Sequence, residues 1–333
     1  MRKDILLSGG CLLILTACQS GDDPVLPNTP PPPTRHSTSP PAPLDQSLQA
    51  LISQYGLSGN PAQDIEIPDS RSPMAELGRK LFFSRSLSGD LDVACASCHH
   101  PMLGGGDNLS LPIGTNSLRT GLLGLGRRHE SPDGPDVPRN APTTFNIALW
   151  KRSLFHDGRI ERLADGNITT PDQPYPQPDP LAGGDLVQAQ ARFPITSDSE
   201  MRGSHFDAGG SSQSCREKLA ERLGGYGSQT TALSPAVHDY WLQAFRTAFN
   251  APDGLPNTLI TEQNISAALS AYQRSQLFIN NAWSAYIQGQ EDALSDKAKQ
   301  GALLFYRQTT ENGYGCVNCH SGDFLAMNNF ITP

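Results

Sequence analysis

Two short motifs place a pair of thiols and an imidazole at the same spacing. Their residues are Cys95, Cys98 and His99 in CASCH, and Cys316, Cys319 and His320 in CVNCH. Two thiols at this spacing can add across the vinyl groups of one haem, and the next residue can bring its imidazole to the iron. Structural zinc sites and vicinal disulfides are the competing interpretations, but zinc needs four thiolate or imidazole ligands at each site. Neither explains a histidine directly after both pairs, so the sequence predicts two covalently attached haem c groups, with His99 and His320 as iron ligands.

Two haem groups alone do not separate an electron carrier from an enzyme. A carrier keeps both irons six-coordinate, with a methionine or a second histidine opposite the proximal one. A catalyst leaves one position open and places acid–base groups over it. The rest of the chain must therefore decide between a non-catalytic electron-transfer lipoprotein and a catalyst.

The elements that position these motifs are predicted to be mostly α-helical. Ser72 and Pro73 are typical of an N-cap and a first helical position. Apolar residues recur at helical spacing in four segments, which are 73–83, 235–248, 265–272 and 298–305. Tyr240 and Trp241 are expected to be core residues. Few stretches alternate with a period of two, so little sheet is expected, and 104–142 and 165–185 are predicted to be loops.

The first residues have the features of an export signal. Arg2 and Lys3 precede an apolar run, which ends in the sequence LTAC. This pattern predicts a lipoprotein signal peptide over 1–17 and a lipid on Cys18, which would attach the protein to a membrane. An ordinary signal peptide is the alternative. Gln19 after the cysteine favours the outer membrane, so we expect a lipid-anchored protein on the periplasmic side of the envelope.

A proline-rich segment follows the signal. Nine prolines lie between Pro24 and Pro43, and such a composition favours an extended chain rather than a core. Residues 18–65 are therefore predicted to be a tether and lead-in. The 333-residue chain has 25 Lys and Arg against 33 Asp and Glu, a formal net charge of −8. This acidic balance argues against nucleic acid as a partner. Cys215 has no obvious partner and is expected to be a buried or free thiol.

Several motifs in a fixed order resemble the bacterial di-haem cytochrome c peroxidases and their MauG-type relatives. In chain order they are LGRKLFFSRSLSGD, CASCH, VPRNAPTTFN, FHDGR, ALSAYQRS, ALSDKAKQGALLF and CVNCH. The resemblance implies two cytochrome c-like domains. These are a peroxidatic haem domain over 66–205 and an electron-entry haem domain over 206–333.

The resemblance also implies roles for three further residues. The segment QARFPITSDSEM matches the part of the family that supplies the distal pocket, which places Gln190 and Glu200 on its glutamine and glutamate. A carboxylate in a poorly hydrated pocket, with a raised pKa, can move a proton between the two oxygens of peroxide. An amide can hold peroxide or water by hydrogen bonds. Asn140 matches a residue that helps to bind calcium in the family, and calcium prefers such oxygen ligands.

The sequence departs from the family at two positions near the haem groups. Where the peroxidases have a distal histidine, LSLPIGTN places Thr115, which predicts a five-coordinate haem as in MauG-type enzymes. His100 and His129 are less favoured substitutes for that ligand. The family's tryptophan between the haem groups is replaced by His156. Trp150 is a nearby alternative, but it is more simply expected to be a core residue.

The C-terminal domain is expected to be incomplete. Pro333 follows His320 closely, whereas the resemblance implies a much longer second domain with its own sixth ligand and calcium ligands. Met327 is predicted to be too near His320 to reach the opposite face of the iron.

The favoured function is reduction of hydrogen peroxide to water, with electrons from a small periplasmic cytochrome or cupredoxin. Electrons would enter at the second haem and pass to the haem at His99. A MauG-type oxidase that modifies a partner protein is the alternative enzyme, and Thr115 favours it. The electron-transfer lipoprotein remains the non-enzymatic alternative.

Overall fold

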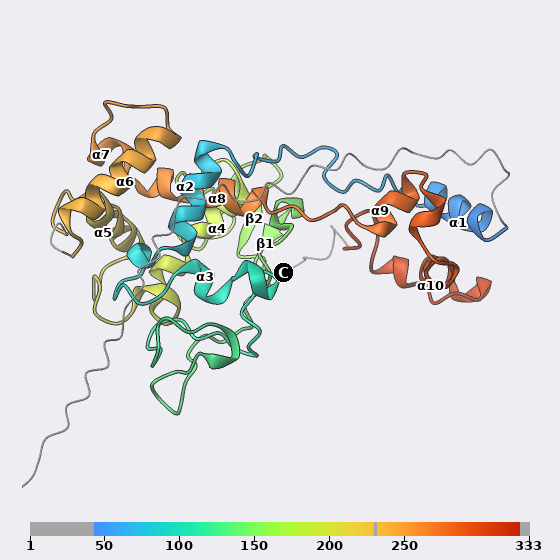
Figure 1. Cartoon of the computed structure of the whole chain (residues 1–333), viewed down its shortest axis with the longest axis horizontal. Coiled ribbons are helices and arrows are strands. Elements are labelled where there is room, and N and C mark those ends of the chain that lie inside the picture. The colour runs from blue at the N-terminus through green and yellow to red at the C-terminus, as the bar shows by residue number, and fades with distance from the viewer. Residues whose placement is uncertain (1–42, 230–231, 327–333) are drawn as a thin grey trace, which may run out of the picture.

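The computed structural model describes residues 43–229 and 232–326, and the polypeptide is mostly helical (Figure 1). The longer helices are α1 (Pro43–Gln54), α2 (Pro73–Phe83), α5 (Ser212–Gly224), α6 (Pro235–Ala248), α8 (Glu262–Ser275) and α10 (Asp296–Tyr306). The shorter ones are α3 (Cys95–Cys98), α4 (Leu186–Ala191), α7 (Pro256–Leu259) and α9 (Ala282–Ile287). Three short antiparallel strands form one sheet in the order β1 (Ser153–Leu154), β2 (Ile160–Arg162), β3 (Ile168–Thr169).

The larger core joins the first half of the chain to helices far along the sequence. Its buried side chains come from α2, α5, α6 and α8, with Val93 and Ala96 beside the first cysteine pair. Helices α2 and α8 pack very closely at Gly78, where an added Cβ would overlap the carbonyl oxygen of Ala268. A glycine is needed there because the two backbones approach within the space of a side chain. This packing holds the helix that precedes CASCH.

A second core lies at the other end of the molecule, where α1, α9 and α10 gather (Figure 1). Leu48 and Leu51 of α1 pack against α10, and the buried Val317 of CVNCH joins the same cluster. Asp45 of α1 is buried, and Lys299 of α10 lies 2.7 Å from its carboxylate. Residues 43–57, predicted as lead-in, are therefore part of the core around the second motif.

The packing changes at a different place from the predicted boundary at 205/206. Leu219, Phe245 and Leu269 all belong to the larger core, so residues up to about Ser275 pack with the CASCH motif. The family motifs give the order of the segments along the chain, but they do not show which helices pack into the same core. The division into 66–205 and 206–333 does not follow these two clusters.

The four predicted helices are confirmed. Ser72 caps α2 by accepting a hydrogen bond from the Ala75 amide, as its sequence position suggested. Trp241 is buried as expected, but Tyr240 is not a core residue, since 51% of it is exposed and Lys80 lies over its ring. Cys215 is a buried free thiol. No helix within the described residues is long and apolar enough to cross a membrane. The predicted signal peptide, Cys18 and Met327 lie outside these residues.

Candidate functional site

The first motif forms one helical turn, and the loop that follows it contacts His99. The Ala94 amide donates to Ser97 Oγ and the His99 amide donates to the Cys95 carbonyl, which together close α3. His99 then leaves the helix, and its Nδ1 lies 2.9 Å from the Pro142 carbonyl oxygen and 3.2 Å from that of Gly105. A backbone carbonyl can only accept, so Nδ1 carries the proton and Nε2 keeps its lone pair. This is the tautomer in which a histidine binds a metal through Nε2.

The charges around the motif also suit this role. Burial lowers the pKa of His99, so its imidazole stays neutral at physiological pH. Burial raises the pKa of Cys95 and of Cys98 to about 12, which disfavours the thiolates that zinc would need. The described cysteines are all free, and the described residues hold no cluster of three His, Cys, Asp or Glu side chains suited to a metal ion. The donor set therefore fits haem better than zinc or a disulfide.

A glycine pair shapes the loop under His99. Gly104 and Gly105 have φ of 73° and 76°, in the left-handed region. A Cβ on Gly105 would lie 2.7 Å from Thr143 Oγ1, whereas a Cβ on Gly104 would meet nothing within 4 Å. Gly105 thus needs both its backbone freedom and its lack of a side chain to present its carbonyl to His99.

We expect Gly105→Ala to destabilise the protein more than Gly104→Ala. Both substitutions cost about 1 kcal/mol of conformational strain, and only the first adds a collision with Thr143. A further loss of roughly 1–2 kcal/mol is expected from that contact. Thermal unfolding of the two variants measures the difference, and equal melting temperatures would show that the contact with Thr143 does not constrain the loop.

The second motif repeats the proximal arrangement. Cys316 lies at the start of the short helix η9 (Cys316–Asn318), and the His320 amide donates to the Cys316 carbonyl. His320 Nδ1 lies 3.2 Å from the Leu325 carbonyl oxygen, so Nε2 is again the free nitrogen. Both motifs therefore leave Nε2 of a histidine without a hydrogen-bond partner beside two thiols, which fits haem at each.

Glu200 lies on an irregular turn that reaches the first motif. The π-helical turn η6 (Asp198–Arg202) carries it, and burial raises the pKa of its carboxyl although the nearby Arg159 guanidinium lowers it. The turn is close to the first motif through the backbone, because Gly114 lies against Ser199 and Glu200 and the neighbouring Ile113 carbonyl lies 3.9 Å from Cys98 Sγ. A half-buried carboxyl with a raised pKa can accept and return a proton near neutral pH.

The other residues of the predicted distal segment have different surroundings. Gln190 is half-buried at the end of α4, and its side chain makes no hydrogen bond to any described residue. Thr115 is buried, and its Oγ1 donates to the Asp198 carbonyl at 2.9 Å. The Thr115 hydroxyl is thus engaged with the turn that carries Glu200.

His100 and His129, the less favoured candidates for the distal ligand, each have partners nearby in the structure. His100 Nδ1 accepts a hydrogen bond from the Met102 amide, and its ring packs edge-on against Phe83. His129 lies 3.4 Å from the Asp136 carboxylate. His129 is therefore held within its own loop, and His100 is held by its loop and by Phe83 of α2.

An aromatic contact links the segments of the two motifs. Trp150 is 39% exposed, and its ring meets that of Phe324 edge-on with 5.1 Å between centroids. Phe324 follows His320 closely in sequence, and the ring of His320 also lies near Phe305. His156, at the family's tryptophan position, is exposed instead. Trp150 is therefore a surface residue in contact with the second motif's segment, not a core indole.

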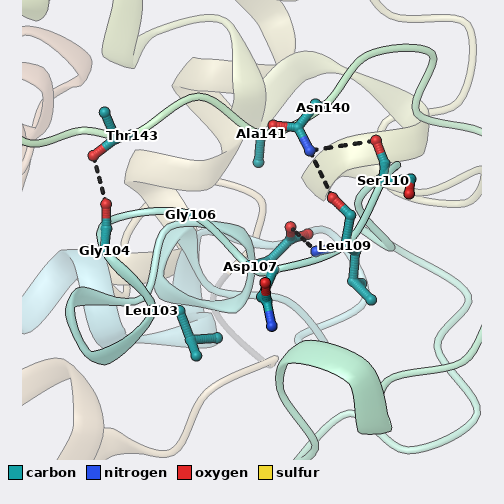
Figure 2. A pocket seen from close by; sticks show the side chains of 10 residues that line it. Leu103, Gly104, Gly106, Asp107, Leu109, Ser110, Asn140, Ala141 and Thr143 are labelled. Carbon is teal, nitrogen blue, oxygen red and sulfur yellow. Dashed lines mark hydrogen bonds between the residues drawn. The ribbon is translucent and has the colours of Figure 1, made fainter.

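Asn140 lines a polar cavity of about 490 Å³ (Figure 2). Its Nδ2 donates to the carbonyl oxygens of Leu109 at 2.6 Å and Ser110 at 3.3 Å. Asp107 lines the same cavity and is almost fully buried, with Oδ1 accepting from the Leu109 amide. Its Oδ2 has no hydrogen-bond partner among the described residues, and burial raises the pKa of this carboxyl. An unpaired buried carboxylate beside amide and carbonyl oxygens fits a hard cation.

Sequence reasoning missed Arg159, Asp107 and Phe324. Arg159 stacks on the Phe155 ring at 3.8 Å and lowers the pKa of Glu200. Arg159 is part of the FHDGR motif, but the sequence predicted a role only for His156 of that motif. The other two have no local signal, because an orphaned carboxylate oxygen and a distant ring contact exist only in the folded chain.

The fold and the paired motifs define a mostly helical protein with two similar haem-binding segments. A family model described as di-haem cytochrome c peroxidase matches residues 72–292. The chain therefore belongs to the di-haem cytochrome c peroxidase family, as its motifs predicted, and the family implies two haem groups.

Curated relatives include both peroxidases and MauG proteins. The chain is similar to cytochrome c551 peroxidase of Nitrosomonas europaea, with 25% identity over 282 residues, 84% of this chain and 61% of that protein. It is also similar to methylamine utilization protein MauG of Methylorubrum extorquens, with 28% identity over 245 residues, 74% of this chain and 48% of that protein. A crystal structure of a MauG-like protein associated with microbial copper homeostasis has a TM-score of 0.47 and 19% identity, covering 81% of this chain and 61% of that one. The chain spans between 48% and 61% of the length of these two curated relatives.

Proposed function

We propose that this protein is a di-haem peroxidase that reduces hydrogen peroxide to water, with electrons from a small periplasmic redox protein. The observation that carries the proposal is the position of Glu200, whose backbone lies against Gly114, next to the Ile113 carbonyl that Cys98 Sγ approaches at 3.9 Å. Burial also raises the pKa of its carboxyl. Peroxide takes up two electrons and two protons and gives two water molecules. Bound haem would supply the electrons and an iron position for peroxide. Cys95 and Cys98 would hold one haem covalently with His99 as an iron ligand, and Cys316 and Cys319 would hold the other with His320 as an iron ligand.

The chain's own residues would then handle the protons. Ionised Glu200 would accept a proton from one oxygen of peroxide and return it to the other, which would leave as water. The second water molecule would take its two protons from solvent. Arg159 keeps part of the carboxyl population ionised by lowering its pKa. The free amide of Gln190 is suited to hold peroxide or water by hydrogen bonds.

A MauG-type oxidase is the second candidate, and Thr115 favours it. The Thr115 hydroxyl is hydrogen-bonded to the Asp198 carbonyl, so the residue offers no nitrogen ligand where the peroxidases have a distal histidine. Such an oxidase would use the same proton chemistry, but take its electrons from a residue of a partner protein.

Electron entry through the His320 segment is part of the proposal. The edge-on contact between Trp150 and Phe324 is the aromatic link between this segment and the domain of His99. We expect Trp150→Leu to slow steady-state turnover with a reduced cytochrome about tenfold, an extra barrier of about 1.4 kcal/mol. Stopped-flow mixing of the oxidised protein with peroxide should be unchanged. Tyr314→Leu, at an aromatic residue 73% exposed in the same segment, is the control. Loss of both reactions in Trp150→Leu would contradict a role in electron delivery.

We also propose calcium at the cavity of Asp107 and Asn140. The side-chain amide of Asn140 would have to turn so that Oδ1 faces the cation, an orientation that coordinates alone do not fix. Adding calcium at a hundredfold excess over its dissociation constant should stabilise the protein by about 2.7 kcal/mol, seen as a higher melting temperature. Magnesium is the control, because it prefers a smaller octahedral site. Asp107→Asn should abolish the effect, and a calcium response that survives this substitution would place the ion elsewhere.

Export, lipid attachment at Cys18 and a position on the outer membrane remain part of the proposal. They are supported by the sequence of residues 1–19.

Peroxide turnover by the full haem-loaded chain tests the function. The peroxidase predicts a high-spin ferric haem, rapid spectral change with peroxide, and oxidation of a reduced cytochrome. A MauG-type oxidase would give the spectral change without cytochrome turnover. Two low-spin haem groups that do not react with peroxide would exclude both enzymes and support the non-catalytic electron carrier.

A further inference from the structure

Two loops each approach the turn that carries Glu200 through a glycine. One is the loop of Gly114, where an added Cβ would overlap the carbonyl oxygen of Ser199 and lie 2.5 Å from that of Glu200. The other is the loop of Gly89, whose amide donates to the Met201 carbonyl at 2.7 Å and where an added Cβ would overlap the Arg202 carbonyl. The turn itself is a short π-helical segment, a type that rarely persists without outside support. Its shape therefore depends on these two loops.

A buried arginine holds each loop by its carbonyl groups. Arg127 is 0% exposed and donates from Nε to Ile113 at 2.6 Å and from Nη2 to Gly114 at 2.7 Å. Its Nη1 reaches the Thr120 and Leu122 carbonyls. Arg222 is 1% exposed and donates from Nη1 to Gly89 at 2.8 Å. Its Nη2 donates to the Ser86 and Ser88 carbonyls.

Neither arginine forms an ion pair within the described residues, although the charges of Asp92 and Asp107 act on Arg127, and that of Asp90 acts on Arg222, from a longer distance. The contrast is with Arg192 and Arg216, which are equally buried but lie in ion pairs with a shared cluster, made up of Asp172, Asp179 and Glu262. Burial lowers the pKa of Arg127, and it lowers that of Arg222 to about 10. An unpaired buried cation is costly, and apolar side chains would pack such a site more cheaply. A guanidinium instead supplies several N–H donors in one rigid plane, which neither an apolar residue nor lysine can do.

We propose that Arg127 and Arg222 are positioning residues that fix the Glu200 turn, Arg127 through the loop of Gly114 and Arg222 through the loop of Gly89. Thr115 adds to the contact of the Gly114 loop, because its amide donates to the Ser199 carbonyl at 3.2 Å and its hydroxyl to that of Asp198. The proposed effect on the reaction rests on the proposed role of Glu200, whereas the proposed effect on the shape of the turn does not.

Hydrogen exchange of the haem-loaded protein tests the structural part. In Arg127→Lys and in Arg222→Lys, the amides of residues 198–202 are expected to exchange at least tenfold faster than in the wild type. The matched control is Arg246→Lys, since its side chain donates to the Gly254 carbonyl, which does not belong to the two loops. Faster exchange confined to 113–122 or 86–89, with the turn unchanged, overturns the proposal. If a lysine variant does not fold, Thr115→Val removes a single hydroxyl and should still speed exchange of the turn.

A double-mutant cycle tests the catalytic part. Arg127→Lys should slow the reaction with peroxide about tenfold in the wild type and less than twofold when Glu200 is already glutamine, because residues that act through one another are not additive. Equal slowing in both backgrounds would show that Arg127 does not act through Glu200. A wild-type rate that Glu200→Gln leaves unchanged would remove the proposed role of Glu200, while exchange of the turn would still decide whether the arginines hold it.

Discussion

Replacing Glu200 by glutamine is expected to slow the reaction of the haem-loaded protein with peroxide by about 10²–10³-fold, the usual contribution of one general acid–base group. Glutamine keeps the size and the hydrogen-bonding ability of the side chain but cannot accept a proton. Binding of cyanide to the ferric protein should be little changed, because the distal space is preserved. Stopped-flow absorbance measures both reactions.

The pH dependence of the same reaction gives a second check. The proton is accepted by the ionised carboxylate, so the wild-type rate should rise with pH through the pKa of Glu200. Burial raises this pKa above the ordinary glutamate value of about 4.3. The rising limb should therefore lie above that value, and it should be absent from Glu200→Gln. Asp198→Asn is the control, since it removes a carboxylate with a side chain 73% exposed on the same turn. A pH profile that keeps its limb in Glu200→Gln would assign the proton transfer to another group.

Replacing His99 by glycine is expected to reduce the peroxide reaction to roughly 1% or less, because the first iron loses its protein ligand. Added imidazole should restore part of the activity and of the visible spectrum, since the glycine leaves room for it. The measurement is the absorbance of the variant with and without imidazole, followed by mixing with peroxide.

His100→Gly provides the matched control for this experiment. The two histidines are adjacent, but only His99 has its Nδ1 held by the Gly105 and Pro142 carbonyls. His100 is held by the Met102 amide and the Phe83 ring, so its loss should leave the spectrum unchanged. A spectral change on replacing His100 would mean that this residue, and not solvent or peroxide, occupies the far side of the iron.

Local patterns predicted the parts of the structure that depend on neighbouring residues. The helices near 73–83 and 235–248 followed from their capping residues and apolar spacing, and both motifs were recognisable from a few letters. Tyr240 was predicted wrongly, because helical spacing shows on which face of the helix a residue lies but not whether another element packs against that face. Lys80 of another helix covers it only in part.

The features that the sequence could not predict are those made by distant segments. In the sequence, Arg127 and Arg222 have no feature that separates them from surface arginines. Only the fold shows that their guanidinium groups are buried and donate to backbone carbonyls of loops. The unpaired oxygen of Asp107 and the contact of Trp150 with Phe324 have the same origin. The association of α1 with α10 was also hidden, because the two helices lie more than two hundred residues apart. Such pairings depend on tertiary packing, which overrides local preference.

That association makes the core around the second motif discontinuous along the chain, because the whole of the larger core lies in sequence between α1 and α10. Contacts between residues so far apart in sequence form slowly, because a large loop must lose conformational entropy before the contact stabilises the chain. The larger core, by contrast, comes from a continuous stretch that can collapse as soon as α8 has been made. We therefore expect this stretch to acquire its haem and its native packing early, and to bring α1 and α10 together as it compacts, so that maturation of the core around the second motif depends on that of the larger core.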